Sequence, residues 1–260
     1  MSAAVLTERR GAALWATLNR ESAMNSLDPD VLAGLEAAMD EAEAEPEVRA
    51  LVLTGSGRAF CAGADLGVIE GAGAPPGAFL QFLESAGGTF SRLERLPLPT
   101  IAAINGIALA GGLELVLCCD LAVAAESARI GDAHANYGLL PGGGASVRLP
   151  RRVGPALAKQ LMFTGAFLEA GELRHSGLLN DVVPGADLGA AVDALVAAIA
   201  AKSPLGLREM KRLLDEGLLQ PPADGLRAEL DAQAAHGRSA DMAEGLAAFR
   251  ENRAPEFTGR

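Results

Sequence analysis

Two hydrophobic periods divide the first two-thirds of the chain into short strands and longer helices. Short apolar runs bounded by glycine, proline or polar turns are typical of buried strands, and apolar residues three and four apart are typical of amphipathic helices. The predicted strands are Ala12–Asn19, Arg49–Thr54, Thr100–Ile104, Leu121–Ala125 and Ala128–Ile130. The predicted helices are one that Asp28 caps and that ends before Pro46, then Ala78–Leu96, Ala145–Val153 and Pro155–Phe163. This order predicts a mixed α/β fold.

The pattern changes in the last third, where helical spacing replaces the alternation of strands and helices. Four helices are predicted there, at Leu188–Ala201, Leu205–Glu216, Gly225–His236 and Met242–Asn252. We therefore expect residues 1–200 to form a core that carries the functional site, and residues 201–260 to form a helical region.

Composition limits the partners and the compartment. The chain has 260 residues and a formal net charge of −11, which argues against nucleic acid as a general partner because phosphate binding needs a basic face. No apolar run approaches the length of a membrane span, and the N-terminus lacks a signal-peptide core. Cys61, Cys118 and Cys119 do not have a metal-ligand spacing. We expect a reduced, cytoplasmic protein with no metal and no membrane partner.

The segment Ile104–Asp120 contains the best candidate for chemistry. Gly111 and Gly112 stand directly ahead of a regular apolar run, as at a loop that opens a helix. The first amides of a helix lack partners and carry the positive end of its dipole, so a ligand oxygen can approach the Gly111 N–H. Glu114 follows about one turn later. This pattern suits oxyanion stabilisation with proton transfer, and alone it suits a glycine-rich strand–helix junction equally well.

Two segments of the chain together resemble the crotonase (enoyl-CoA hydratase/isomerase) superfamily. They are Gly57–Leu66, which reads GRAFCAGADL, and Ile104–Leu115, which reads INGIALAGGLEL. Further matching segments occur in the family's order, at Leu18–Arg20, Met24–Leu27, Gly138–Gly144 and Glu244–Phe249. The resemblance thus extends over nearly the whole chain.

The resemblance implies a spiral of ββα turns followed by a C-terminal helical trimerisation region. It implies a homotrimer or a dimer of trimers, and an acyl-CoA thioester as substrate. No separate cofactor is expected, because coenzyme A is part of the substrate. By position, the Ala64 and Gly111 amides correspond to the pair that holds the thioester oxygen. The residues that correspond to CoA contacts, mostly through main chain, are Ala23, Ala62, Asp65 and Leu66.

The sequence departs from the family pattern at the second catalytic position. Hydratases of the family use two glutamates; Glu114 matches the first, but His134 stands at the second. Histidine is able to accept a proton or hold a water near neutral pH. We therefore expect a hydratase acting on a 2-enoyl-CoA through Glu114 and His134. A double-bond isomerase and a non-catalytic acyl-CoA-binding homologue stay open.

The lysines that commonly meet the CoA phosphates are also missing. Ser22 and Gly67 occupy their places, so the phosphates need other cations. Arg58, or Arg250 and Arg253 from the tail of a neighbouring subunit, are the candidates.

Overall fold

The computed structural model describes residues 3–65, 67–68 and 77–260, and the strands of this part form two sheets. The strands are β1 (Val5–Arg10), β2 (Ala13–Leu18), β3 (Ala50–Gly55), β4 (Ala59–Cys61), β5 (Thr100–Ile104), β6 (Ile107–Leu109), β7 (Leu121–Ala125), β8 (Arg129–Gly131), β9 (Phe167–Glu169) and β10 (Asp181–Val183). The larger sheet has the order β1-β2-β3-β5-β7-β10 and the smaller one β4-β6-β8-β9. Pairing is parallel except for β1 with β2 and β8 with β9.

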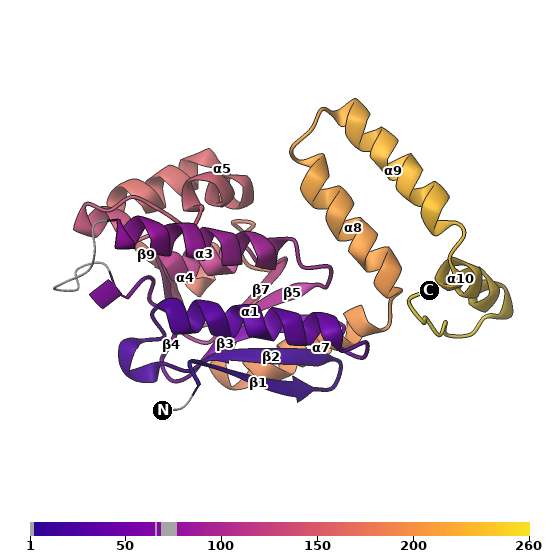
Figure 1. Cartoon of the computed structure of the whole chain (residues 1–260), viewed down its shortest axis with the longest axis horizontal. Coiled ribbons are helices and arrows are strands. Elements are labelled where there is room, and N and C mark those ends of the chain that lie inside the picture. Colours follow the sequence, from indigo (N-terminus) through magenta and orange to yellow (C-terminus); the bar gives the residue numbers. More distant parts are fainter. Residues whose placement is uncertain (1–2, 66, 69–76) are drawn as a thin grey trace.

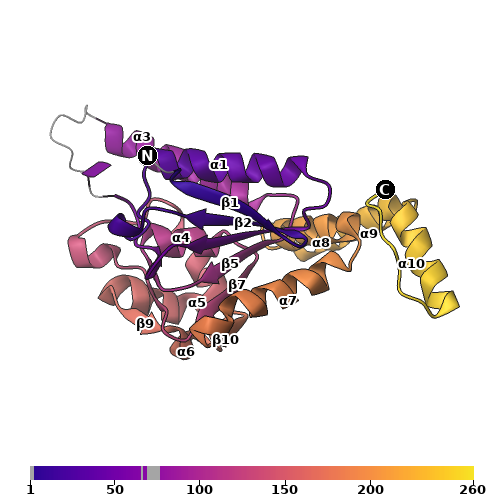
Figure 2. The same cartoon turned by 90° about the horizontal axis from the view of Figure 1, so that it is seen from below.

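Helices cover both faces of the larger sheet, and further helices follow at the C-terminal end. The helices of the described residues are α1 (Pro29–Ala44), α3 (Ala78–Glu94), α4 (Gly111–Leu117), α5 (Ala145–Thr164), α6 (Ala170–Leu173), α7 (Leu188–Ala200), α8 (Pro204–Gly217), α9 (Pro222–His236) and α10 (Ala240–Glu251). Three 3-10 turns complete the fold: η1 (Glu21–Ala23), η2 (His134–Tyr137) and η3 (Gly185–Asp187). Helices α1 and α3 run side by side on one face (Figure 1), and α7 lies across the other (Figure 2).

Successive side chains along the strands of the larger sheet belong alternately to two separate hydrophobic cores. Successive side chains of a strand point to opposite faces, so neighbouring residues enter different clusters. Leu14 and Leu51 join the large cluster that α1 and α3 cover. Trp15 and Val52 point the other way and pack with Val192 of α7. These strands are buried on both faces, which explains why their sequences are continuously apolar.

Successive turns of the chain each supply one strand to each sheet. β3, β5 and β7 add in parallel to the larger sheet, while β4, β6 and β8 add in parallel to the smaller one. Because parallel strands end at the same edge of a sheet, the residues that follow β4, β6 and β8 are brought together. These residues are Ala62–Asp65, Ala110–Gly111 and Asp132–His134, which are far apart in sequence.

The long predicted elements and the short strand at Ala128–Ile130, which is β8, are confirmed, and four other short strands were missed. Thr100–Ile104 and Leu121–Ala125 are strands with the predicted bounds, and Asp28 caps α1 by accepting a hydrogen bond from Val31 N at 2.8 Å. Gly154, with φ 76° and ψ 160°, interrupts α5 where two helices were predicted. Strands β4, β6, β9 and β10, which have three residues each, and β1, a mostly exposed edge strand, were not predicted.

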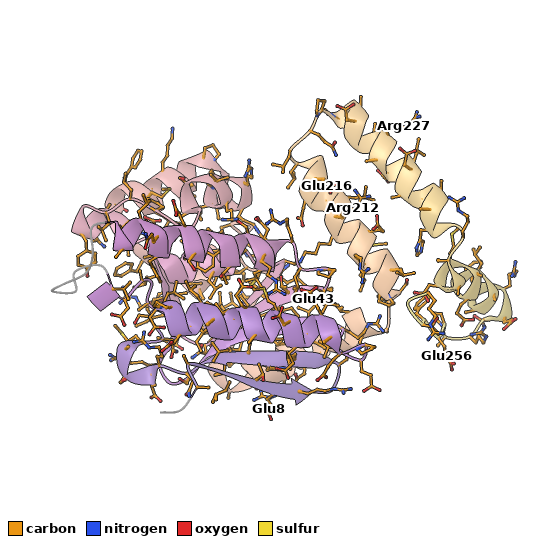
Figure 3. The ribbon with its side chains drawn as sticks, in the orientation of Figure 1. Glu8, Glu43, Arg212, Glu216, Arg227 and Glu256 are labelled. Atoms are coloured by element: carbon orange, nitrogen blue, oxygen red, sulfur yellow. The ribbon has the colours of Figure 1, made fainter. Side chains whose placement is uncertain are left out.

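Helices α8, α9 and α10 extend away from the layered body (Figure 1). Lys211 of α8 reaches back and pairs with Asp120 at 2.8 Å. Arg212, on the same helix, pairs with Glu216 at 2.6 Å (Figure 3). Among the residues described, no single helix is long and apolar enough to cross a membrane; Gly185–Ala200 and Pro204–Gly217 satisfy that length and composition test only as a pair, across a bend of 104°.

Asn25 fastens the segment before α1 to the turn between β3 and β4. It is fully buried and has φ 56°, a left-handed conformation that asparagine tolerates better than most residues. Its Nδ2 donates to Ser56 O at 2.9 Å and to Ala59 O at 2.7 Å. Its Oδ1 accepts from Arg20 N at 2.9 Å. This side chain therefore adds to the backbone bonds that hold the segment, such as the one from Ala62 N to Met24 O at 3.1 Å.

We predict that Asn25→Ala lowers the free energy of unfolding by roughly 2–4 kcal/mol, because buried carbonyl oxygens lose their donor. Asn252→Ala is the matched control: Asn252 has φ 53° but is exposed, so it reports only the left-handed conformation, at about 1 kcal/mol or less. Urea unfolding followed by circular dichroism measures both values. Equal losses in the two variants would contradict the role given to the buried hydrogen bonds.

Candidate active site

The turn between β6 and α4 is formed by a strained alanine and two glycines. Ala110 has φ 49° and ψ −118°, a backbone conformation that residues with a Cβ rarely adopt. Its N–H donates to Gly131 O at 3.1 Å. A Cβ on Gly112 would lie 2.0 Å from the Cys61 carbonyl oxygen, so glycine is required there. Helix α4 thereby begins directly against the backbone of β4.

Two backbone amides, those of Ala64 and Gly111, converge at this junction. A Cβ on Gly111 would lie 3.5 Å from Ala64 N, and one on Gly63 would lie 3.3 Å from Gly111 N. Leu27 holds the first segment in place, since its N–H donates to Gly63 O at 2.8 Å and its carbonyl accepts from Asp65 N at 2.9 Å. Within the described residues neither converging amide has an acceptor. Such a pair is able to hold one oxyanion.

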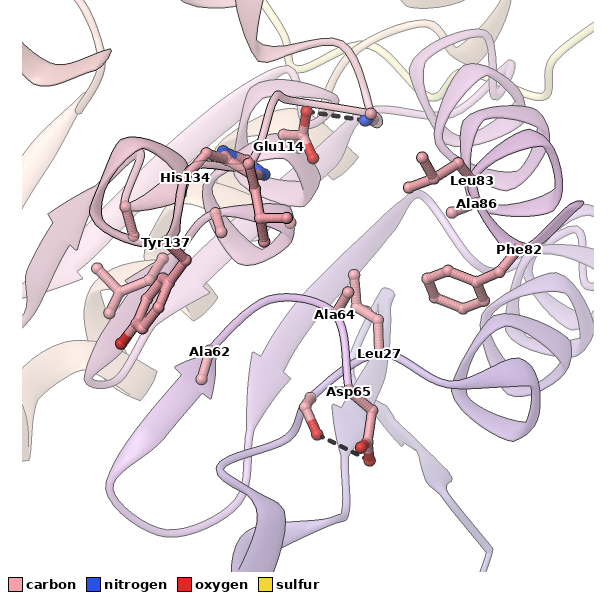
Figure 4. Close-up of a pocket in the computed structure, with 18 of the residues that line it drawn as sticks. Leu27, Ala62, Ala64, Asp65, Phe82, Leu83, Ala86, Glu114, His134 and Tyr137 are labelled. Carbon is pink, nitrogen blue, oxygen red and sulfur yellow. Dashed lines mark hydrogen bonds between the residues drawn. The ribbon is translucent and has the colours of Figure 1, made fainter. Parts of the chain in front are cut away.

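Glu114 lies one turn into α4 and is almost fully buried, at 3% exposure. Its Oε1 accepts hydrogen bonds from Gly143 N at 2.8 Å and from Ala145 N at 3.0 Å. Both bonds go to Oε1, so Oε2 is the oxygen available to a water or a substrate in the cavity (Figure 4). Burial raises the pKa of Glu114, and the opposing effects of the two amides and of His134 do not cancel it.

His134 enters the cavity from the turn that follows β8. Ala133 has φ 63°, and this left-handed residue reverses the chain so that His134 opens η2. His134 Nδ1 lies 3.1 Å from Asp132 Oδ2. Burial lowers the pKa of His134, but the hydrogen bond and charge of Asp132 and the charge of Glu114 outweigh it and raise that pKa. Glu114 and His134 are therefore electrostatically coupled.

A cavity of about 430 Å³ joins these groups. Every predicted site residue except Leu66 lines it: Ala23, Ala62, Ala64, Asp65, Gly111, Glu114 and His134. Figure 4 shows Ala62, Ala64 and Asp65 on one side of the cavity and Glu114 with His134 on another. Leu66 lies outside the described residues. The structure thus brings together seven residues that come from four separate stretches of the sequence.

The contribution of helix α3 to the apolar end of the cavity was not predicted. Helix α3 supplies most of it, through Phe79, Phe82, Leu83, Ala86 and Phe90. Tyr137 and Leu140 close the opposite side and are largely exposed. In the sequence, the spacing of Phe82, Ala86 and Phe90 has the same period as any core-facing helix, so periodicity alone does not separate a cavity wall from a core. An apolar acyl group suits this end.

The side chain of Asp65 is occupied by contacts within the protein. It accepts from Arg20 Nη2 at 2.8 Å, from Gly67 N at 2.9 Å and from Ser26 Oγ at 3.3 Å. The hydrogen bond from Arg20 is the largest cause that lowers the pKa of Asp65. Only the main chain of Asp65 is thus left to meet a ligand.

The arginines that are candidates for binding the CoA phosphates differ in whether they already form ion pairs within the protein. Arg253 is bound within its own chain, with its guanidinium 2.6 and 2.9 Å from the Glu244 carboxylate oxygens. Arg58 is exposed. In residues 3–65, 67–68 and 77–260, no group of three or more His, Cys, Asp and Glu side chains is placed to hold a metal ion.

The sequence model of the enoyl-CoA hydratase/isomerase family matches residues 8–260. The chain belongs to this family, which lies within the crotonase superfamily. It is 40% identical over 249 residues to the mouse mitochondrial enoyl-CoA hydratase domain-containing protein 2, covering 94% of this chain and 83% of that protein. It is 36% identical over 244 residues to a crotonyl-CoA hydratase of Syntrophomonas wolfei, covering 94% and 93% of the two chains.

The fold is also that of the family. A crystal structure of an enoyl-CoA hydratase from Bacillus anthracis superimposes with a TM-score of 0.94 at 36% identity, covering 99% of this chain and all of that one. The predicted crotonase-like spiral of α/β type is therefore confirmed. The protein is an acyl-CoA enzyme of the hydratase/isomerase type.

We predict that Gly111→Ala lowers turnover of an enoyl-CoA by about a hundredfold, the cost of disabling one oxyanion donor. The new Cβ would lie 3.5 Å from Ala64 N, inside the space that an oxyanion would occupy, and 2.9 Å from the Leu27 Cδ1 methyl. Steady-state kinetics measure the loss, and thermal unfolding checks that the variant is folded. A folded variant with full activity would exclude this pair of amides as the oxyanion site.

Proposed function

We propose that this protein hydrates a 2-enoyl-CoA thioester across its C2–C3 double bond. The observation that supports this most directly is the position of Glu114. A buried carboxylate, with one oxygen fixed and the other available, stands one helical turn from the Gly111 amide and is coupled to His134. The hydratases among the relatives make hydration the first reaction to test.

The geometry accounts for each proton in the reaction. The thioester oxygen lies between the Ala64 and Gly111 amides, which stabilise the negative charge that develops on it. Glu114 Oε2 takes a proton from a water held between Glu114 and His134, and the hydroxyl forms a bond to C3. The π electrons move toward the thioester, and C2 then takes a proton from the acid–base pair. One water is added, and no redox change occurs.

The same arrangement defines how the substrate is placed. Its acyl group extends toward the apolar end of the cavity formed by α3, Tyr137 and Leu140. The only coenzyme in the proposed reaction is the CoA that the substrate carries. The location in the cytoplasm stays a prediction from the cysteine content.

A double-bond isomerase is the second candidate. It stays open because a histidine replaces the second glutamate that the hydratases of the family use. Such an enzyme moves one proton between C2 and C4 and needs a single base, a role that Glu114 alone suits. A non-catalytic binding protein has no need of a buried carboxylate with a raised pKa. Incubation with crotonyl-CoA and with a 3-enoyl-CoA, followed by the absorbance of the 2-enoyl thioester, separates the three.

We predict that Glu114→Gln lowers crotonyl-CoA hydration by about a hundredfold to ten-thousandfold, because it keeps the shape but removes the base. His134→Ala should lower turnover more than it raises KM, since the CoA contacts lie elsewhere. His134→Glu restores two carboxylates and should preserve or raise hydration. Glu216→Gln, on the exposed side of α8, is the matched control and should leave the rate unchanged.

One result would overturn the hydratase proposal. If the native protein is inactive on 2-enoyl-CoA but His134→Glu gains hydration activity, the native protein is not a hydratase. The isomerase or the binding protein would then be the better description of its function.

We also propose that the chain forms a homotrimer or a dimer of trimers through its last three helices. Apolar side chains are exposed along α8, α9 and α10, which stand away from the body of the protein (Figure 1). They are Met210, Leu214, Leu218, Leu219, Leu226, Leu230, Leu246 and Phe249. So large an exposed apolar surface indicates contact with another chain.

We predict that sedimentation equilibrium at micromolar concentration gives the mass of three or six chains. Leu214→Asp with Leu230→Asp, one on each of α8 and α9, should shift the mass toward one chain, because burying these charges in an interface is costly. Leu6→Asp, at a partly exposed position of edge strand β1, is the control. A native monomer would contradict the proposal.

A further inference from the structure

Asp132 is a buried carboxylate that has no role in the reaction proposed above. It is 1% exposed, so it meets neither solvent nor a substrate in the cavity. Burying a carboxylate is costly unless it is paired. Among the described residues, His134 is the one side chain that forms an ion pair or hydrogen bond with it, at 3.1 Å between His134 Nδ1 and Asp132 Oδ2. Asp132 therefore acts on the site through His134.

The backbone holds the two side chains in this relation. They are separated by Ala133, whose φ of 63° turns the chain back so that neighbouring side chains i and i+2 meet. His134 N donates to Asp132 O at 2.8 Å, and His134 O accepts from Leu139 N at 3.1 Å. The backbone of His134 is thus fixed on both sides, and the ring is held by its contact with Asp132. Since Nδ1 is engaged by Asp132, Nε2 is the nitrogen left for the cavity.

We infer that Asp132 is a positioning residue: it fixes the imidazole of His134 with Nδ1–H toward its own carboxylate and Nε2 toward the substrate. This inference rests on the proposed function, and it assigns the second acid–base group of the site as an Asp132–His134 pair. The charged imidazole then donates from Nε2. Glu114 Oε2 takes the proton from water, His134 Nε2 gives a proton to C2, and Glu114 afterwards returns its proton to His134 through solvent.

The electrostatics favour this division of roles. Burial alone would lower the pKa of His134, but Asp132 and Glu114 together raise it. Asp132 reaches His134 from the end of β8, and Glu114 reaches it from α4; Tyr137 and Asp65 are the other titratable side chains that line the cavity. A larger share of His134 is therefore charged near neutral pH, which makes it a donor. A neutral imidazole with unfixed tautomers would serve either role poorly.

The first test is the pH dependence of Asp132→Asn. A donor His134 makes activity fall as pH rises through its pKa. Removing the Asp132 charge lowers that pKa, so the falling limb of the kcat profile should move to lower pH. Turnover should drop from about tenfold up to the ~10⁴-fold that loss of the equivalent carboxylate costs Ser-His-Asp enzymes, with KM nearly unchanged. An unshifted limb would overturn the inference.

A double-mutant cycle separates this role from a structural one. In a His134→Ala background, Asp132→Asn should cost little further activity, because the one effect of Asp132 on the site that remains is that of its charge on the pKa of Glu114. If Asp132 only stabilised the fold, the two losses would multiply, and the inference would be wrong. Asp181→Asn, an exposed aspartate of β10, is the matched control and should change neither rate nor pH profile.

Histidine NMR gives a readout independent of activity. The chain has three histidines, His134, His175 and His236, so ¹⁵N-histidine spectra are resolvable and His134→Gln assigns the signal. The native protein should show a protonated Nδ1 on neutral His134, and Asp132→Asn should lower the pKa of that ring alone. Failure here with an active hydratase would overturn only the inference. A normal NMR result in a protein inactive on 2-enoyl-CoA would overturn only the proposed reaction.

Discussion

The close contact between the backbone at the start of α4 and the backbone that follows β4 determines the rest of the site. A Cβ at position 112 would stand 2.0 Å from the Cys61 carbonyl oxygen, so any side chain there would push the helix off the sheet. That separation would part the amides of Ala64 and Gly111. The chain accepts a non-glycine residue at φ 49° to make this junction, at a cost on the order of 1–3 kcal/mol. Strain at this turn is thus coupled to the convergence of two donors.

Burial and charge act in opposite directions on the two acid–base groups. Burial raises the pKa of Glu114 and lowers that of His134, which would leave both neutral. The amides of Gly143 and Ala145 favour the charged carboxylate, and the latter lies at the first turn of α5, the positive end of that helix. Asp132 favours the charged imidazole. Each group therefore has its own fixed partner, which holds it in place in the cavity.

The features that could be predicted from the sequence are those that depend on interactions between residues close together in the chain. Strands such as Thr100–Ile104 and the cap at Asp28 depend on local patterns and were correct in type and position. Three-residue strands depend on their neighbours, and of these only β8 was predicted among the described residues. Glu114 and His134 were placed in one site by resemblance, because 19 residues, including strands β7 and β8, lie between them. The contact of Asp132 with His134 depends on a left-handed Ala133, which no rule for alanine predicts.

The histidine at the second acid–base position changes which groups face the substrate. The acid–base site still holds two carboxylates, but only one of them, Glu114, faces the cavity. Two carboxylates facing one small cavity repel each other, and one of them tends to stay protonated. Here the second carboxylate, Asp132, lies behind the imidazole and has no access to water or substrate. Its negative charge raises the pKa of His134, with which it is in contact, and contributes to raising the pKa of Glu114. Glu114 then faces an imidazole with a raised pKa instead of a second carboxylate, an arrangement that suits Glu114 as the base and the imidazole as the acid.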